Sequence, residues 1–302
     1  MNPQRLALRT SAERPSANRP NGLSGVITDR LQHAGRAAVA ALYDELALET
    51  KPGLVSPVDN GSHRDMTAQT FMRSLFALRH SFPRLVRLGA EHADFSALER
   101  VGVAAEARML DATGGINTHR GAIFCLGLLC ASAGALLADG EPVGAGALRR
   151  KLMINWGETL ARRVFASGLS NGASAVRRFG LRSAGGEAAA GFPTLFETTW
   201  PALRAATEHG LSPREARLQA LFETIAVLDD TNLAHRGGLA GLRHAQHAAR
   251  DYLLAGGVCR ADGMAQAQRV HRDFVERNLS PGGAADTLAA ACWIQRVTDG
   301  PP

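Results

Sequence analysis

An uncharged apolar segment near the middle of the chain constrains the fold more than any other feature. The run from Ala122 to Leu137 contains no charged residue. It is shorter than the roughly 20 apolar residues that a membrane-spanning helix needs, and Gly127 and Gly134 interrupt it. We therefore predict that this segment forms a central helix buried inside a globular domain.

The segments on either side of this run show the helical period. Between residues 26 and 48, apolar residues recur at i, i+3, i+4 and i+7 until Pro52-Gly53 breaks the pattern. Capping boxes at 96–99 and at 212–215 predict the starts of two further helices. Because no segment alternates with period two, we predict an all-α fold, a single multi-helix globular domain with active-site loops at helix ends.

Composition and the amino-terminal residues set the expected domain boundaries. Of the 302 residues, 45% are hydrophobic and 21% are charged, which is typical of a globular protein that folds alone or as a homo-oligomer. Residues 1–24 are rich in Arg, Ser, Asn and Pro and lack the apolar region of a secretory signal. We expect a disordered leader over 1–24, one helical domain over 25–300 and a cytoplasmic location.

The positive charge of the chain indicates an anionic partner. A net charge of +6 fits nucleic acid, a membrane surface or a phosphorylated small molecule. Lys51 and Lys151 are the only lysines, and the arginines are dispersed along the chain instead of forming a basic run. We therefore expect a phosphorylated small molecule, and neither nucleic acid nor a membrane, as the partner.

The first of five polar clusters lies between the first two predicted helices, at 51–55 and 59–65. It combines cations, glycines and carboxylates, which are the components of a magnesium-phosphate site. A surface turn that ends in an N-cap at Asp65 or Thr67 explains the same residues equally well. The candidate residues here are Lys51, Asn60, His63, Arg64 and Asp65.

The second cluster, at 113–121, directly precedes the apolar helix. Backbone N–H groups at a helix N-terminus can hold a phosphate, and Asn117, His119 and Arg120 add polar side chains. A glycine-rich turn with no strand before it is a weak motif by itself.

The remaining three clusters lie at 178–193, 228–238 and 278–286. The first of these is otherwise read as a flexible loop. The next contains Asp229, Asp230 and Asn232, which suit a metal or general-base site but are also good N-caps. In the last, Asp286 falls in the first turn of a helix, so a plain helix connection is the alternative.

Taken together, the five clusters resemble the triphosphoribosyl-dephospho-coenzyme A synthase family. The first two motifs resemble the branch that serves malonate decarboxylase more than the branch that serves citrate lyase, and Ala234 stands where a larger apolar residue is familiar. The resemblance covers residues 41–290, and five motifs in order are far more specific than any one of them. They are KPGLVSPVDNGSHRDM at 51–66, GGINTHRGAIF at 114–124, GGEAAAGFP at 185–193, DDTNLAHRGG at 229–238 and SPGGAAD at 280–286.

The resemblance implies a transferase that uses ATP and 3′-dephospho-CoA. It would form 2′-(5″-triphosphoribosyl)-3′-dephospho-CoA and release adenine, and a separate transferase would pass the product to the acyl carrier subunit of malonate decarboxylase. Substitution at the anomeric carbon needs a carboxylate near an oxocarbenium-like transition state and a base for the attacking hydroxyl. Mg²⁺ and cations would hold the triphosphate.

The resemblance also implies roles for individual residues. Asp65, Asp229 and Asp230 would act as base or bind metal, with Asp65, Asp230 and Asn232 as the metal set. Glu106 and Glu187 are further candidates for the carboxylate at the reacting ribose. Substrate and phosphate contacts are expected from Lys51, Asn60, His63, Arg64, Asn117, His119, Arg120, Arg236, Gly237, Gly238, Gly282 and Gly283.

Two other classes of protein remain open at this point. A helical, metal-dependent hydrolase of ADP-ribose-like substrates would use similar Asp-rich and Asn-rich loops, and it predicts ribose release without transfer. A basic helical nucleic-acid-binding protein would need its arginines on one face and would bind with a steep salt dependence.

Overall fold

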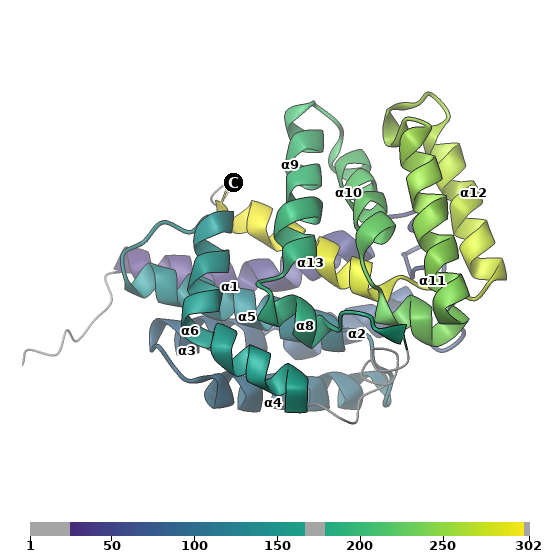
Figure 1. Ribbon diagram of the computed structural model, residues 1–302. Helices are drawn as coiled ribbons and strands as arrows, with labels where there is room; N and C mark the ends of the chain where they lie inside the picture. The colour runs from purple at the N-terminus through teal and green to yellow at the C-terminus, as the bar shows by residue number, and fades with distance from the viewer. Residues whose placement is uncertain (1–24, 167–178, 299–302) are drawn as a thin grey trace, which may run out of the picture.

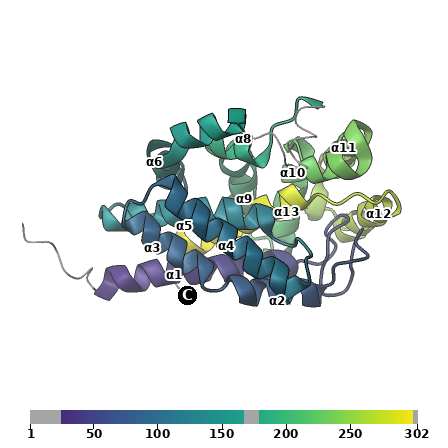
Figure 2. The same ribbon diagram turned by 90° about the horizontal axis from the view of Figure 1, so that it is seen from below.

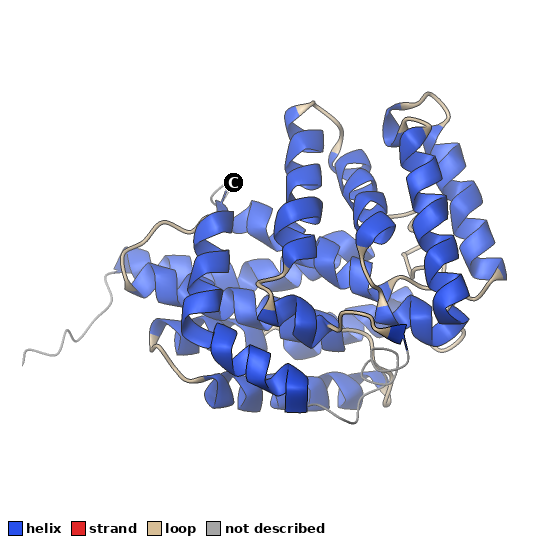
Figure 3. Ribbon diagram, viewed as in Figure 1, coloured by secondary structure: helices blue, strands red, loops and turns tan. Residues whose placement is uncertain are grey.

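The computed structural model of the chain describes residues 25–166 and 179–298 (Figure 1). The expected leader at 1–24, and Arg178 at the start of the third cluster, lie outside this part. Every regular element in the described ranges is a helix, so the all-α prediction is confirmed (Figure 3). The elements are α1 Gly25–Leu46, α2 Ala68–Leu78, α3 Ser81–Ala90, α4 Phe95–Thr113, α5 Arg120–Ala138, α6 Ala145–Ala166, α8 Ala184–Ala189, the π-helix η1 Thr194–Thr199, α9 Trp200–Glu208, α10 Pro213–Val227, α11 Thr231–Leu254, the 3₁₀ turn η2 Gly257–Cys259, α12 Gly263–Glu276 and α13 Gly282–Thr298.

Helix α5 is the centre of the amino-terminal half. It packs against α1, α3, α4, α6 and α13, and Figure 2 shows it between α1 and α6. Among the described residues it is the one helix long and apolar enough to cross a membrane, but 83% of its most apolar window is buried by the other helices. The predicted central helix is therefore confirmed, and its apolar composition follows from its burial on all sides.

Glycines allow α3 and α5 to approach more closely than side chains would permit. A Cβ atom at Gly89 would lie 1.9 Å from the carbonyl oxygen of Ala131, and one at Gly134 would lie 1.9 Å from that of Val86. Gly134 therefore does not interrupt the central helix. It allows the backbones of the two helices to come into contact.

The capping signals predicted some helix starts correctly. The capping box of α10 is present, with the Ser212 hydroxyl accepting from the N–H of Glu215 and Pro213 in the first turn. The box predicted at Ser96 was wrong, because α4 begins at Phe95 and the side chain of Asp94 accepts from the N–H of Ala97. Asp94 is as good a cap as a serine and lies two residues earlier in the chain.

The carboxyl-terminal half stands across this central layer. Helices α9 and α10 pack as one pair and α11 and α12 as another, and both pairs stand upright in Figure 1. Helix α13 passes through the molecule and packs against α1, α5, α10 and α11. The connection between α10 and α11 and the one between α12 and α13 lie at the lower end of these pairs in Figure 1.

Replacing Gly89 with alanine should destabilise the fold. The new methyl group would collide with the backbone of α5, and such overpacking costs roughly 1–3 kcal/mol. Gly102→Ala is the matched control, because nothing lies within 4 Å of a Cβ at this mid-helix position, and alanine there should stabilise α4 by up to about 1 kcal/mol. Urea unfolding of both variants measures the difference, and a neutral Gly89→Ala variant would contradict the close approach.

Candidate active site

Hydrogen bonds join the first, fourth and fifth motifs. The imidazole of His63 contacts the Ser280 hydroxyl through Nε2 at 2.8 Å and the guanidinium of Arg236 through Nδ1 at 3.0 Å. The Ser62 hydroxyl donates to the carbonyl oxygen of Leu279 at 2.6 Å. Residues more than 170 positions apart in the chain thus meet at one place.

The Arg236 guanidinium fixes the protonation state of His63. Because it donates to Nδ1, that nitrogen must keep its lone pair, and the proton of the neutral ring lies on Nε2 toward Ser280. Burial and the charge of Arg236 lower the pKa of His63 to about 4. Arg236 also donates to the Ser62 carbonyl and to the Asn278 side chain. The two residues expected to bind phosphate therefore hold the 59–65 loop in place.

Asp230 connects the N-termini of two helices. One carboxylate oxygen accepts from the N–H groups of Asn232 and Leu233 at the start of α11, and the other accepts from the N–H of Ala284 in the first turn of α13. The residue is 1% exposed, and burial raises its pKa although these N–H groups oppose the shift. Its carboxylate is thus occupied by backbone groups, as in the N-cap alternative.

Asp286 lies over the first turn of α5. Its carboxyl accepts from the N–H of Ala122, and a Cβ atom at Gly121 would lie 2.0 Å from its Oδ2. Burial and the neighbouring acids Glu45 and Asp230 raise the pKa of Asp286 well above its usual value. Asp286 and Gly121 both keep part of their surface exposed. Glycine is therefore required at 121 for the second and fifth motifs to meet.

Lys51 forms a buried ion pair below these loops. Its Nζ donates to the carboxylate and to the backbone carbonyl of Glu45, both at 2.6 Å, and the lysine is 1% exposed. Burial lowers the pKa of Lys51, while Glu45 acts in the opposite direction. The Lys51 carbonyl accepts from His271 on α12. Lys51 therefore has a structural partner and does not lie at the surface as a free phosphate ligand.

His119 is buried between α2 and α5. Its Nδ1 lies 2.7 Å from the Ser74 hydroxyl, and its ring stands edge-on to Phe71. Burial, with a smaller effect from the charge of Lys51, lowers the pKa of His119 to about 3, so the ring is neutral at pH 7. Its Nε2 and the hydroxyl of Thr118 are buried without a hydrogen-bond partner. His119 does not supply a cation for phosphate at neutral pH.

The third motif joins the others through Glu187 and Asp229. Glu187 accepts from Arg182 at 3.0 Å and from the N–H of Thr194 at 3.1 Å, and Asp229 accepts from the N–H of Arg182. Burial raises the pKa of the Cys125 thiol well above its usual value. The nearby acids Asp286 and Glu187 raise this pKa further. All five motifs consequently share one region of the molecule.

The other predicted site residues lie at the rim of this region. Arg120 is half-exposed and forms an ion pair with Glu106, and Asn117 accepts from the Arg120 N–H at the start of α5. Arg64 is exposed and makes no hydrogen bond or ion pair with the residues that the structure describes. The remaining predicted residues in or near these loops are Asn60, Asp65, Asn232, Gly237, Gly238, Gly282 and Gly283.

For two of these glycines, the structure explains why a residue with a side chain would not fit. Gly238 has φ 62° and ψ −167° inside α11, where it kinks the helix, and a Cβ at Gly237 would collide with the Leu279 side chain. Their role is to let the fourth motif pass close to the fifth.

The residues expected to hold Mg²⁺ do not form a ligand cluster. Asp65 is largely exposed beside His63, whereas the oxygens of Asp230 are taken up by N–H groups. Within 25–166 and 179–298, no group of three or more His, Cys, Asp or Glu side chains is arranged to hold a metal ion. The structure therefore gives no protein-held metal geometry from which to derive a catalytic step.

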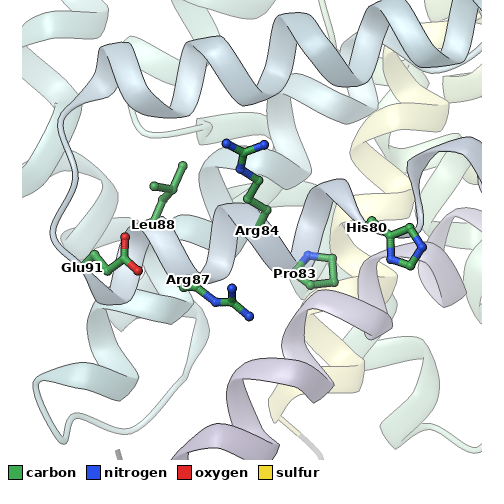
Figure 4. Close-up of a pocket in the computed structure, with 6 residues that line it drawn as sticks. All are labelled: His80, Pro83, Arg84, Arg87, Leu88 and Glu91. Atoms are coloured by element: carbon green, nitrogen blue, oxygen red, sulfur yellow. The ribbon is translucent and has the colours of Figure 1, made fainter. Parts of the chain in front are cut away.

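A surface hollow lies away from the motifs. It has a volume of about 470 Å³ and is formed by α3 and the residues that cap its two ends, as Figure 4 shows. Its walls are His80, Pro83, Arg84, Arg87, Leu88 and Glu91, none of which belongs to the five motifs. We therefore place the candidate active site at the meeting point of the motifs and not in this hollow.

Several residues of this region, among them Glu45, Ser74 and Asp286, were not among the predicted site residues. Glu45 and Ser74 lie on helices outside the motifs, and Asp286 was interpreted as a first-turn residue. Glu45 interrupts the apolar pattern of its helix next to Leu42 and Leu46, so an acid on a predicted buried face was the available signal. Asp286 offered no comparable signal, because an acid in the first turn of a helix is common.

Comparison with known proteins identifies the family of the chain. Residues 31–301 match the family described as ATP:dephospho-CoA triphosphoribosyl transferase. The chain belongs to this family. A relative from Acinetobacter calcoaceticus, described as a probable 2-(5″-triphosphoribosyl)-3′-dephosphocoenzyme-A synthase, is 36% identical over 272 residues, which are 89% of this chain and 93% of the relative. No solved structure matches the chain.

Membership of the triphosphoribosyl transferase family confirms the resemblance and the enzyme class. The match includes all five motifs, since they lie between residues 51 and 286. The protein is thus a transferase of a family that uses ATP as substrate.

The buried His119 should make stability depend on pH. The folded protein takes up this proton near pH 3 and the unfolded chain takes it up near pH 6.5, so the unfolded state binds more protons between these values. Stability supplied by neutral His119 is therefore lost as the pH falls from about 6.5. Replacing His119 with Asn should reduce the slope of unfolding free energy against pH by up to about 1.4 kcal/mol per unit.

Urea unfolding between pH 4 and 6.5 measures this slope. The control is His247→Asn, since His247 is exposed on α11 and should leave the slope unchanged. Carboxylates titrate in all three proteins, so the comparison isolates His119. Equal slopes for wild type and His119→Asn would contradict the buried neutral ring.

Proposed function

We propose that the protein joins the triphosphoribosyl group of ATP to the ribose 2′-hydroxyl of 3′-dephospho-CoA and releases adenine. The observation that carries this proposal is the meeting of the five motifs. The contacts of His63, Asp230, Asp286 and Arg182 bring them to one end of the helix pairs. Family membership supports the same reaction.

The rim of this region supplies cations for the triphosphate. Arg64, Arg120 and Arg182 are exposed or half-exposed, and each belongs to or directly precedes a motif. Guanidinium groups bind phosphate oxygens through charge-assisted, often bidentate hydrogen bonds. Arg64 has no competing partner among the described residues, so it is our first candidate for a phosphate ligand.

The inner part of the region supplies carboxylates for the reacting ribose. Glu187 is 8% exposed and accepts from a guanidinium and from a backbone N–H. Asp229 accepts from the backbone N–H of Arg182, whose guanidinium donates to Glu187. An ionised carboxylate in this position would stabilise positive charge at C1″ or accept the proton of the attacking hydroxyl.

We further propose that the product serves malonate decarboxylase. The support is the amino-acid sequence of the first two motifs, which resembles that of the malonate branch. The product would then be passed by a separate transferase to the acyl carrier subunit. Mg²⁺ is expected to accompany the triphosphate, because Mg²⁺ commonly binds through substrate phosphates and water with few protein ligands. A cytoplasmic location stays a prediction.

The reaction is tested with the purified protein, ATP, Mg²⁺ and 3′-dephospho-CoA. We expect adenine to be released only when dephospho-CoA is present, together with a product whose mass equals dephospho-CoA plus the triphosphoribosyl group. Chromatography of the base and mass spectrometry of the adduct measure both. Ribose products that form without dephospho-CoA would favour the hydrolase instead.

Replacing Arg64 with Gln should weaken ATP binding. The loss of one charge-assisted contact of roughly 1.5–3 kcal/mol should raise the KM for ATP about tenfold or more with little effect on stability. The matched control is Arg272→Gln on α12, which is also exposed and lies outside the motifs. Steady-state kinetics of both variants measures the KM for ATP. Equal KM values for the two variants would contradict the role of Arg64.

A further inference from the structure

We infer that Asp286 is the acid that gives a proton to adenine as the bond between C1″ and N9 breaks. This inference rests on the proposed function and assigns one side chain to one step of it. Glu187 and Asp229 have partners that suit a carboxylate anion. Asp230 gives both carboxylate oxygens to backbone N–H groups. Asp286 accepts from one backbone N–H and faces other acids, so its surroundings suit the protonated form.

Asp286 joins two helices at the place where the motifs meet. The residue lies in α13 just past its first turn, and its carboxyl accepts from the N–H of Ala122 in the first turn of α5. The missing side chain of Gly121 leaves the room that Oδ2 occupies. Because Asp286 and Gly121 are both only partly buried, a bound nucleotide could reach this carboxyl.

The groups that face Asp286 are acidic or neutral. Of the titratable side chains on the elements packed against α13, Glu45 on α1, Asp230 before α11 and Cys125 on α5 interact with this carboxyl. Glu45 is paired with the Lys51 side chain at 2.6 Å, whereas Asp286 forms no ion pair with the residues that the structure describes. The two neighbouring acids thus lie in unlike surroundings, the arrangement that assigns different roles to two carboxyl groups.

A protonated carboxyl is what the departing base requires. Adenine leaves as a neutral molecule only if a ring nitrogen receives a proton when the electron pair of the C1″–N9 bond moves onto the ring. The 2′-oxygen of dephospho-CoA forms the new bond to C1″ and loses its own proton, which restores the proton count of the enzyme. One proton therefore passes in net from hydroxyl to adenine, and no other reactant is consumed.

The carboxyl of Asp286 is tested with a leaving group that needs no acid. In 7-methyl-ATP the methyl group already places positive charge on the purine ring, so the base departs without protonation. Asp286→Asn keeps the size and polarity of the protonated acid. With ATP we expect its kcat to fall about 100-fold or more, while with 7-methyl-ATP it should stay within about fivefold of wild type.

Controls separate this inference from folding and from the proposed function. Asp29→Asn, on the exposed part of α1, should leave both rates unchanged. Equal losses with the two nucleotides, or full activity of Asp286→Asn with ATP, would overturn the role of Asp286 alone. A wild-type protein that does not transfer from ATP would overturn the proposed function itself.

The wild-type enzyme offers a test that needs no variant. With ATP, kcat should decline as the pH rises and Asp286 loses its proton, whereas with 7-methyl-ATP this alkaline decline should be absent. Identical pH profiles for the two nucleotides would overturn the inference.

Discussion

The hydrogen bonds of Asp230 are the interaction on which the arrangement of this site depends. One buried carboxylate accepts backbone N–H groups from the starts of both α11 and α13, and so it fixes the fourth motif against the fifth. Helix N-termini leave unpaired N–H groups that must be satisfied when buried. A change at Asp230 would leave donors unpaired on two helices at once, so a loss of activity in such a variant could not be attributed to catalysis alone.

Burial then determines which polar groups of the region are charged. Lys51 and Glu45 are removed from water together and stabilise each other, while His119 and His63 are held neutral. Asp286 accepts from only one backbone N–H and faces other acids, so burial and these acids together raise the pKa of its carboxyl. The ions that can meet a triphosphate are consequently the arginines of the rim, and the inner residues set the position and protonation of the carboxyl groups.

This division accounts for a reaction with two unlike demands. A triphosphate needs exposed cations, and substitution at an anomeric carbon needs carboxyl groups in different protonation states. The helical scaffold separates the two, since exposed loops and the first residue of α5 carry the arginines, while Glu187 and Asp230 lie buried at helix starts and Asp286 belongs to α13. The close contact of α3 and α5 through Gly89 and Gly134 keeps this scaffold compact beneath the site.

The sequence by itself determined the all-α fold, the central helix, the start of α10 and the five motifs, because helical period, capping residues and glycine-rich loops are local signals. It did not separate anchoring residues from ligands. Lys51, His63, His119 and Arg236 are the polar types expected of a phosphate site, yet each is held by partners distant in the chain or is buried. Only the tertiary structure decided their protonation and revealed Asp286 beside Gly121, since burial and contacts between distant residues are set by how the helices pack.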